Sequence, residues 1–228
     1  MSDTAKRHAA LDKKPGPEQV LEALTEGNRR FYQDCPRHPR TGMLRRQQAH
    51  VSDQSEHAQA TILACSDSRV PVERIFDAGI MDLFVVRVAG NVVGRATAAS
   101  LEYGALHVHT PVMVVLGHSG CGAVTAAWHH RQEGVPSESE RIAHLLEHID
   151  PALDRVMASG LQGEQAMQAA VEENVWQAIA DLGQLSLPVR QASQEGHLLV
   201  IGAIYDLSNG QVRWLDQQKA GSVLQGKG

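Results

Sequence analysis

The sequence predicts an α/β fold: a central, mainly parallel sheet of four strands plus an antiparallel edge strand, helices on both faces and an N-terminal helical arm. Two observations support it. Four short segments are almost uninterrupted runs of apolar residues, which is typical of parallel strands buried on both faces. Segments with helical periodicity separate them, and such alternation with right-handed crossovers builds a layered sheet. The four expected strands are 60–64, 83–88, 112–116 and 198–203.

The whole chain, 1–228, is expected to form one domain, since 228 residues with 43% hydrophobic composition can bury a single core. The charged residues 1–16 are expected to be a flexible lead. A helix is predicted from Pro17 to Tyr32 because apolar residues recur there at helical spacing and proline suits a first helical turn. We expect this arm, 17–34, to pack on a partner subunit.

Helical spacing also appears between and after the expected strands. The predicted helices are 96–108, 122–131, 139–157 and 165–185. The Asn209-Gly210 pair is a turn signal between two apolar runs. Residues 211–215 are therefore predicted to return antiparallel to the fourth strand, at an edge of the sheet.

Composition excludes several classes of protein. The net charge is −5 and no basic stripe occurs, which argues against nucleic-acid binding. The apolar runs are too short to span a bilayer, and the polar N-terminus lacks the core of a signal peptide, so a cytoplasmic protein is expected. Three cysteines, Cys35, Cys65 and Cys121, favour metal binding or catalysis over a disulfide framework. Cys35 has no ligand partner at useful spacing.

Two motifs offer metal ligands. Cys65-Ser66-Asp67-Ser68-Arg69 follows the first strand, and His118-Ser119-Gly120-Cys121 follows the third. Thiolates, imidazole and carboxylate are ligands of zinc, and ligand sites in open α/β sheets form beyond the carboxyl ends of strands. If the two strands are neighbours, both motifs reach one crevice. A pair of ordinary buried core cysteines is the competing interpretation.

The fourth ligand decides between a structural and a catalytic zinc site. Asp67 could complete a closed site as the fourth ligand. Arg69 lies two residues further on the same side of an extended chain, and its guanidinium can bind a carboxylate with two hydrogen bonds. Pairing with Arg69 would withdraw Asp67 from the metal and leave a position for water, as catalytic zinc sites do.

These motifs resemble those of the β-class carbonic anhydrases. The similarity runs from about Ala60 to Ala127 and includes the segment 84–91, and the later segment 202–207 is also similar. The resemblance implies zinc held by Cys65, His118 and Cys121. It also implies that Asp67 and Arg69 act as a catalytic dyad.

The resemblance further implies where the substrate binds. Phe84, Ala89 and Tyr103 match the lining of an apolar CO2 pocket at a dimer interface, and Gly122 matches a backbone donor to bicarbonate. One branch of the family has an inhibitory bicarbonate site built around a Trp three residues before the first Cys. Ile62 occupies that position here, which implies the branch without that site.

The expected activity is reversible hydration of carbon dioxide to bicarbonate and a proton, by attack of zinc-bound hydroxide. The resemblance implies a homodimer or a dimer of dimers. From the composition, no nucleic-acid or membrane partner is expected. Two alternatives stay open: hydrolysis of carbonyl sulfide or carbon disulfide, and a non-catalytic zinc protein. Many members carry Gln nine residues before the first Cys; the ungapped count places Glu56 here.

Other residues with reactive side chains are weaker candidates. His144 and His148 have ligand spacing on a helix, but the charge-rich surroundings favour exposed side chains. Glu102 precedes Tyr103 on a predicted helix, where a structural hydrogen bond competes with a catalytic role.

Overall fold

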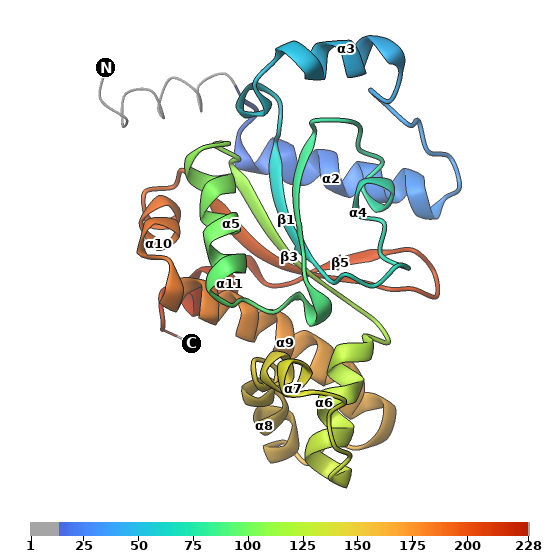
Figure 1. Cartoon of the computed structure of the whole chain (residues 1–228). Helices are drawn as coiled ribbons and strands as arrows, with labels where there is room; N and C mark the ends of the chain where they lie inside the picture. The colour runs from blue at the N-terminus through green and yellow to red at the C-terminus, as the bar shows by residue number, and fades with distance from the viewer. Residues whose placement is uncertain (1–13, 228) are drawn as a thin grey trace.

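The centre of the chain is a five-stranded sheet in the order β2-β1-β3-β4-β5, seen in a computed structural model that describes residues 14–227 (Figure 1). The first four strands are parallel, and β5 pairs antiparallel with β4. The predicted fold class is confirmed. The strands are β1 (Ala60–Ala64), β2 (Leu83–Arg87), β3 (Val112–His118), β4 (Leu199–Tyr205) and β5 (Val212–Trp214).

The strand register brings the Cys65 motif and the His118 motif to the same end of the sheet, where the parallel strands have their carboxyl ends. In β1, Ala64 lies opposite Arg87 of β2 and Leu116 of β3. Because the three strands run in parallel, the residues after Ala64 and the end of β3 emerge side by side. Every residue of β1 and β3 is buried, as their apolar sequences predict.

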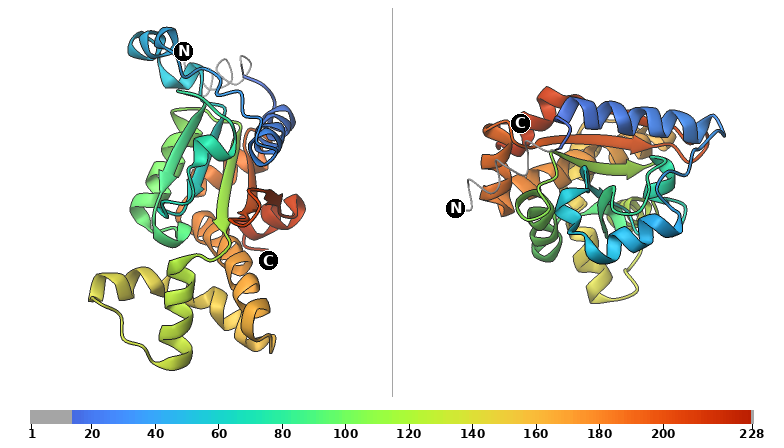
Figure 2. Two further views of the ribbon diagram at one scale, coloured as in Figure 1. Left: turned by 90° about the vertical axis from the view of Figure 1, so that its right-hand side faces the viewer. Right: turned by 90° about the horizontal axis from the view of Figure 1, so that it is seen from above.

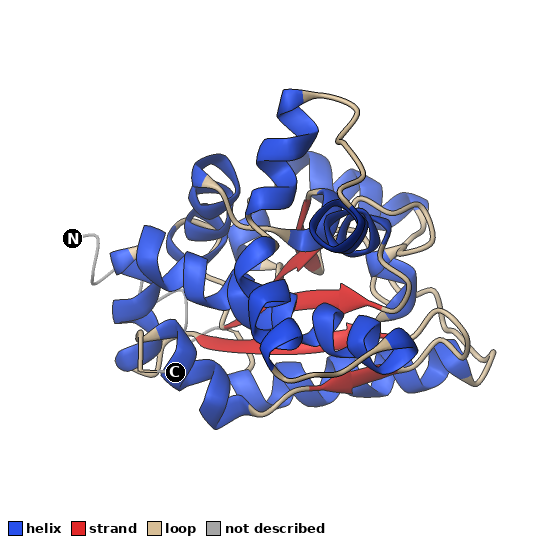
Figure 3. Cartoon of the chain, turned by 90° about the horizontal axis from the view of Figure 1, so that it is seen from below, coloured by secondary structure: helices blue, strands red, loops and turns tan. Residues whose placement is uncertain are grey.

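Helices cover both faces of the sheet (Figures 1 and 3). Leu63 points to a face packed by four helices, whereas its neighbour Ile62 points to the face packed by two others. This alternation follows from the two-residue period of a strand. The first face holds α5 (Arg95–Leu106), α9 (Gly163–Leu185), α10 (Leu187–Gln194) and α11 (Gln217–Leu224); the second holds α2 (Pro17–Tyr32) and α4 (Val72–Ile75).

A second group of helices lies beyond the carboxyl edge of the sheet (Figure 2). Their apolar side chains pack with those of Cys65 and Cys121 in one buried cluster. This helical group therefore closes the edge where the two motifs emerge. It consists of α6 (Gly122–Glu133), α7 (Glu140–Glu147), α8 (Asp150–Ala158) and the first half of α9.

The N-terminal helix α2 has the predicted bounds, Pro17–Tyr32. Its buried residues Val20 and Leu24 pack with the sheet of the same chain. Gly27 allows the closest approach, since a Cβ there would lie 2.0 Å from the carbonyl oxygen of Phe76. The packing of 17–34 on a partner subunit stays a prediction. The expected flexible lead, 1–16, lies mostly outside the described residues.

Some predicted boundaries are wrong. The single helix expected over 139–157 is two helices, α7 and α8, because Pro151 opens α8 and has no N–H for a continuing helix. The helix α3 (Met43–Val51) was not predicted; it has no buried residue, so its sequence lacks an apolar stripe facing the core. The short elements η1 (Gln54–Glu56) and η2 (Ala89–Asn91) flank β1 and β2. None of the helices within the described residues is long and apolar enough to cross a membrane.

Candidate metal centre

Three side chains converge at the carboxyl edge of the sheet. Cys65 follows β1, His118 ends β3, and Cys121 is the residue that precedes α6. One ligand atom from each lies within 4.8 Å of the other two, and all three residues are buried. The structure thus brings together the three residues that the sequence proposed as ligands, because β1 and β3 are neighbours.

His118 is oriented for ligation. Its Nδ1 lies 3.0 Å from the carbonyl oxygen of Ser119, so a proton on Nδ1 leaves the Nε2 lone pair free. Nε2 is buried and has no hydrogen-bond partner. An unpaired buried nitrogen costs free energy, and a metal ion would use it.

The pKa values of the two cysteine thiols are shifted in opposite directions. The pKa of Cys65 is lowered, first by a hydrogen bond from Cys121 and then by the backbone N–H groups of Asp67 and Gly90. These N–H groups lie 3.4 and 3.3 Å from Cys65 Sγ. Because it faces that thiolate and is buried, Cys121 has a raised pKa. A divalent cation would offset the repulsion between the two cysteines if both were thiolates. This set of donors therefore fits zinc.

Asp67 lies beside the three ligands and is clamped by Arg69. The guanidinium donates from Nε to Oδ1 at 2.9 Å and from a terminal nitrogen to Oδ2 at 2.6 Å. This ion pair holds the pKa of Asp67 well below its usual range. Asp67 Oδ2 is 3.9 Å from His118 Nε2, so an ionised carboxylate borders the ligand cluster, and its Oδ2 accepts a hydrogen bond from the Arg69 guanidinium. Arg69 also donates to the carbonyl oxygen of Gly120, which ties the two motifs together.

Two supporting residues were missed by the sequence analysis. Arg87, at the end of β2, donates to the carbonyl oxygens of Cys65 and Asp67 at 3.1 and 2.6 Å. Arg87 ends a predicted strand, and this position could have indicated a role beside the Cys65 motif. Asn174 of α9 donates to the carbonyl oxygen of Gly90 at 2.8 Å. These two residues are 84 positions apart, so no local pattern could have revealed that contact.

Of the residues proposed to bind substrate, Ala89 and Gly122 lie near the metal ligands. Ala89 begins the turn whose next residue, Gly90, donates to Cys65 Sγ. Gly122 is exposed and begins α6 directly after Cys121, and no atom lies within 4 Å of the place where its Cβ would be. The space beside the Gly122 backbone is therefore open to a small molecule.

Phe84 and Tyr103 lie elsewhere in the same chain. Phe84 is opposite Thr61, four residues before Cys65, which corresponds to about 13 Å along a strand. Tyr103 stacks on Phe84 at 6.0 Å between ring centroids and is 47% exposed. Glu56, in η1, is exposed and nine residues before Cys65. One chain alone does not bring these three residues to its own metal ligands.

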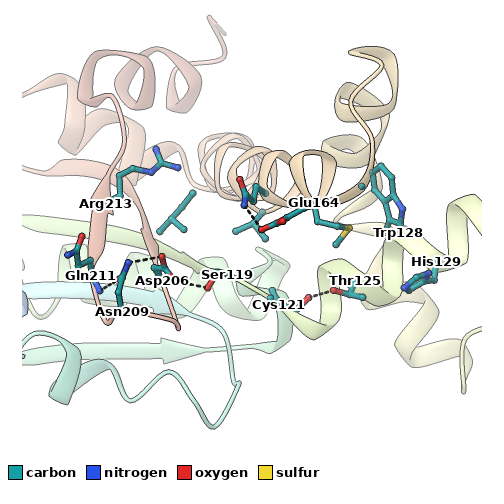
Figure 4. A pocket seen from close by; sticks show the side chains of 16 residues that line it. Ser119, Cys121, Thr125, Trp128, His129, Glu164, Asp206, Asn209, Gln211 and Arg213 are labelled. Atoms are coloured by element: carbon teal, nitrogen blue, oxygen red, sulfur yellow. Dashed lines mark hydrogen bonds between the residues drawn. The ribbon is translucent and has the colours of Figure 1, made fainter. Parts of the chain in front are cut away.

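A cavity of about 770 Å³ is lined by Cys121 and by residues of α6, the start of α9 and the β4–β5 turn (Figure 4). Trp128, Met167 and Val171 contribute apolar walls, and Asn209 and Arg213 contribute polar groups. Neither Asp67 nor Arg69 lines it. This cavity is therefore distinct from the space beside the Asp67 carboxylate.

The weaker candidates have ordinary surroundings. His144 is exposed and pairs with Glu147 at 3.0 Å. Ser186 donates a hydrogen bond to Glu102, which gives that carboxylate a structural partner. Cys35 is an exposed free thiol. Within residues 14–227, the cluster of Cys65, His118 and Cys121 is the one group of three or more such side chains that could hold a metal ion.

Comparison with known proteins identifies the family. The family described as carbonic anhydrase matches residues 60–212. The chain belongs to the carbonic anhydrase family. It is 36% identical over 197 residues to a carbonic anhydrase of Mycolicibacterium smegmatis, covering 86% of this chain and 92% of that protein. It is 33% identical over 199 residues to carbonic anhydrase 2 of Mycobacterium tuberculosis, covering 86% and 91%.

Solved structures place the chain in the β class of carbonic anhydrases. The β-carbonic anhydrase CcaA superposes with a TM-score of 0.68 at 27% identity, covering 87% of this chain and 88% of that one. The Coccomyxa β-carbonic anhydrase, solved with acetazolamide, gives a TM-score of 0.65 at 26% identity, covering 86% of both chains. The resemblance seen in the sequence is confirmed for the family and for its β class.

Proposed function

We propose that this carbonic anhydrase catalyses the reversible hydration of carbon dioxide to bicarbonate and a proton. The observation that carries the proposal is the buried cluster of Cys65, His118 and Cys121, with the clamped carboxylate of Asp67 at its border. These three ligands would hold zinc, which when bound makes water nucleophilic near neutral pH.

Asp67 would orient the attacking water. Because Arg69 keeps it ionised, its carboxylate accepts hydrogen bonds and cannot donate them. A water molecule that donates to Asp67 therefore presents an oxygen lone pair in another direction, toward the substrate. The same clamp would keep Asp67 from acting as a fourth ligand. We assign the chain on this basis to the branch with an open fourth position, consistent with Ile62 where the other branch has Trp.

Backbone and apolar groups would bind the substrate. Carbon dioxide carries no net charge, so an apolar wall such as Ala89 suffices. Gly122 is the first residue of α6, where a backbone N–H has no partner within the helix, and this N–H would donate to an oxygen of bicarbonate. Arg87 would hold the chain between Cys65 and Asp67 in place through its two bonds to their carbonyl oxygens.

We further propose that two copies of the single domain form a homodimer in which Phe84 and Tyr103 complete the pocket of the other copy. The edge strand β2 is only partly buried, and Tyr103 is half exposed beside it. The helix α3 also exposes large apolar side chains: Met43 at 62%, Leu44 at 79% and Val51 at 81%. Exposed apolar groups of this kind are typical of subunit interfaces. Pairing of dimers into tetramers rests on the family resemblance.

Hybrid dimers test the shared pocket. A copy with Cys65→Ser lacks a metal site but retains its aromatic pair, and a copy with Phe84→Ala and Tyr103→Ala retains its metal site. If pockets are shared, co-expression of the two inactive chains restores one complete site, and each hybrid dimer regains about half of the normal activity. A mixture as inactive as its parents, with hybrid dimers shown by mass spectrometry, would place the pocket within one chain.

Stopped-flow measurement of CO2 hydration, alongside the zinc content of the same sample, tests the function. The expected result is one zinc per chain and rapid hydration that is lost with the metal. Carbonyl sulfide and carbon disulfide are assayed in parallel. Hydrolysis of either gas without CO2 hydration would replace the proposed substrate, and zinc without any turnover would identify a non-catalytic protein.

A further inference from the structure

Gly90 connects the metal ligands to the long helix α9. Its N–H donates to Cys65 Sγ at 3.3 Å, and its carbonyl oxygen accepts from the side-chain amide of Asn174 at 2.8 Å. Gly90 and Asn174 are both buried, and Asn174 is only 2% exposed. The two peptide groups that flank Gly90 therefore connect helix α9 to the sulfur of Cys65.

The turn that contains Gly90 has two consecutive residues in the left-handed region. Gly90 has φ +69°, and Asn91 has φ +46° directly after it. Glycine and asparagine are the residues that adopt this region most readily, so the sequence suits the turn. A Cβ at Gly90 would also lie 3.1 Å from side-chain atoms of Ala123 and Ile149, so the turn is pressed against α6 and α8. The hydrogen bond from Asn174 adds a further restraint on the orientation of the peptide groups in this turn, including the one whose N–H faces Cys65.

We propose that Asn174 is a positioning residue for the metal centre. Its amide fixes the Gly90 carbonyl oxygen and so directs the N–H of the same turn at Cys65. An N–H···S bond draws charge from a thiolate, and partners of this kind typically change metal affinity or activity by about 10- to 100-fold. The inference concerns the metal site assigned under the proposed function and rests on it.

A purely structural role for Asn174 predicts something different. Truncation of Asn174 would then lower the stability of the protein, as at any buried position of α9. It would leave the charge on Cys65 Sγ unchanged. Val175 supplies the matched control. It is fully buried on the same helix, and it packs toward Gly117 and Gly202 of the sheet rather than toward Gly90.

The experiment uses the full-length protein loaded with cadmium-113 and labelled with nitrogen-15 glycine. Scalar coupling between the cadmium nucleus and the Gly90 amide proton reports the N–H···S bond directly. We expect coupling in the unchanged protein and in Val175→Ala, and none in Asn174→Leu or Asn174→Ala. Zinc transfer to a chelator should be about 10-fold faster in the two Asn174 variants than in Val175→Ala.

Several outcomes overturn the proposal. Coupling retained in the Asn174 variants, or lost equally in Val175→Ala, assigns Asn174 a structural role only. Absence of coupling in the unchanged protein shows that Gly90 does not bond the sulfur. Asn174→Ala removes atoms and cannot crowd the core. The coupling measurement on this variant therefore tests the proposal if Asn174→Leu does not fold. A cadmium-113 shift outside the range of two-thiolate coordination would instead refute the metal site, and with it the proposed function.

Discussion

Replacing Arg69 by alanine is expected to release Asp67 toward the metal. The substitution removes both guanidinium bonds to the carboxylate, at 2.9 and 2.6 Å, and the bond to the carbonyl oxygen of Gly120. One bond stays, because the backbone N–H of residue 69 also donates to Asp67 Oδ1 at 2.9 Å. The pKa of Asp67 should then rise toward its usual range, while the carboxylate becomes free to turn toward His118.

The magnitude follows from the exposure of the pair. Hydrogen bonds to charged groups contribute about 1.5 to 3 kcal/mol where solvent is excluded, but the Arg69 side chain is 56% exposed. Solvent therefore screens the clamp, and its contribution falls below that range. Loss of a screened pair of this kind shifts an equilibrium by at most about fivefold, so the balance between clamped and metal-bound Asp67 should shift by up to about fivefold. CO2 hydration should fall by a similar factor, about two- to fivefold.

A cobalt-loaded sample gives the decisive assay. Azide should change the visible spectrum of the unchanged protein by taking the open coordination position. In Arg69→Ala the carboxylate of Asp67 competes for that position, so higher azide concentrations are needed. Arg29→Ala is the control, because Arg29 pairs with Glu26 on the surface of α2. An azide response in Arg69→Ala equal to that of the control would refute the reasoning.

Three further outcomes are expected. Cys65→Ser should lose zinc and CO2 hydration together, and an active, metal-free variant in a metal analysis would contradict the ligand assignment. Burial lowers the pKa of Lys14 to about 8, so between about pH 8 and 10.5 the unfolded chain holds more protons there and stability rises with pH. Urea unfolding should show that rise in the unchanged protein and not in Lys14→Met; equal profiles would contradict it. Gly27→Ala should lower the unfolding free energy by about 1 to 3 kcal/mol, because its Cβ would meet backbone atoms of Phe76. Gly42→Ala places its Cβ in open space, so it should cost less, through the change of N-cap residue of α3 alone, and equal melting temperatures of the two variants would remove the packing argument.

Strand positions were predictable because each parallel strand is an apolar run that local sequence reveals. β1 occupies the predicted 60–64, and the three other parallel strands differ only at their ends. Helices were less predictable where burial is slight or the helix short. α3 carries no buried residue, and the break between α7 and α8 depends on one proline.

The convergence of the three proposed metal ligands was predictable for a related reason. Both ligand motifs directly follow predicted strands, and the carboxyl ends of parallel strands lie at the same end of a sheet. The proposed ligands therefore come together if the two strands are adjacent. The role of Asn174 could not be predicted, since its partner Gly90 is 84 residues away on another element. The location of Phe84 and Tyr103 away from the chain's own ligands also needed the strand register.

The sequence by itself determined the fold class, the family and the three proposed zinc ligands, because each depends on residue types at short spacing. It also indicated the Asp67–Arg69 pair, whose members are two residues apart. Only the tertiary structure decided which side chains support that chemistry. Arg87, Gly90 and Asn174 reach the ligands through packing of distant elements, and such packing is a property of the folded chain.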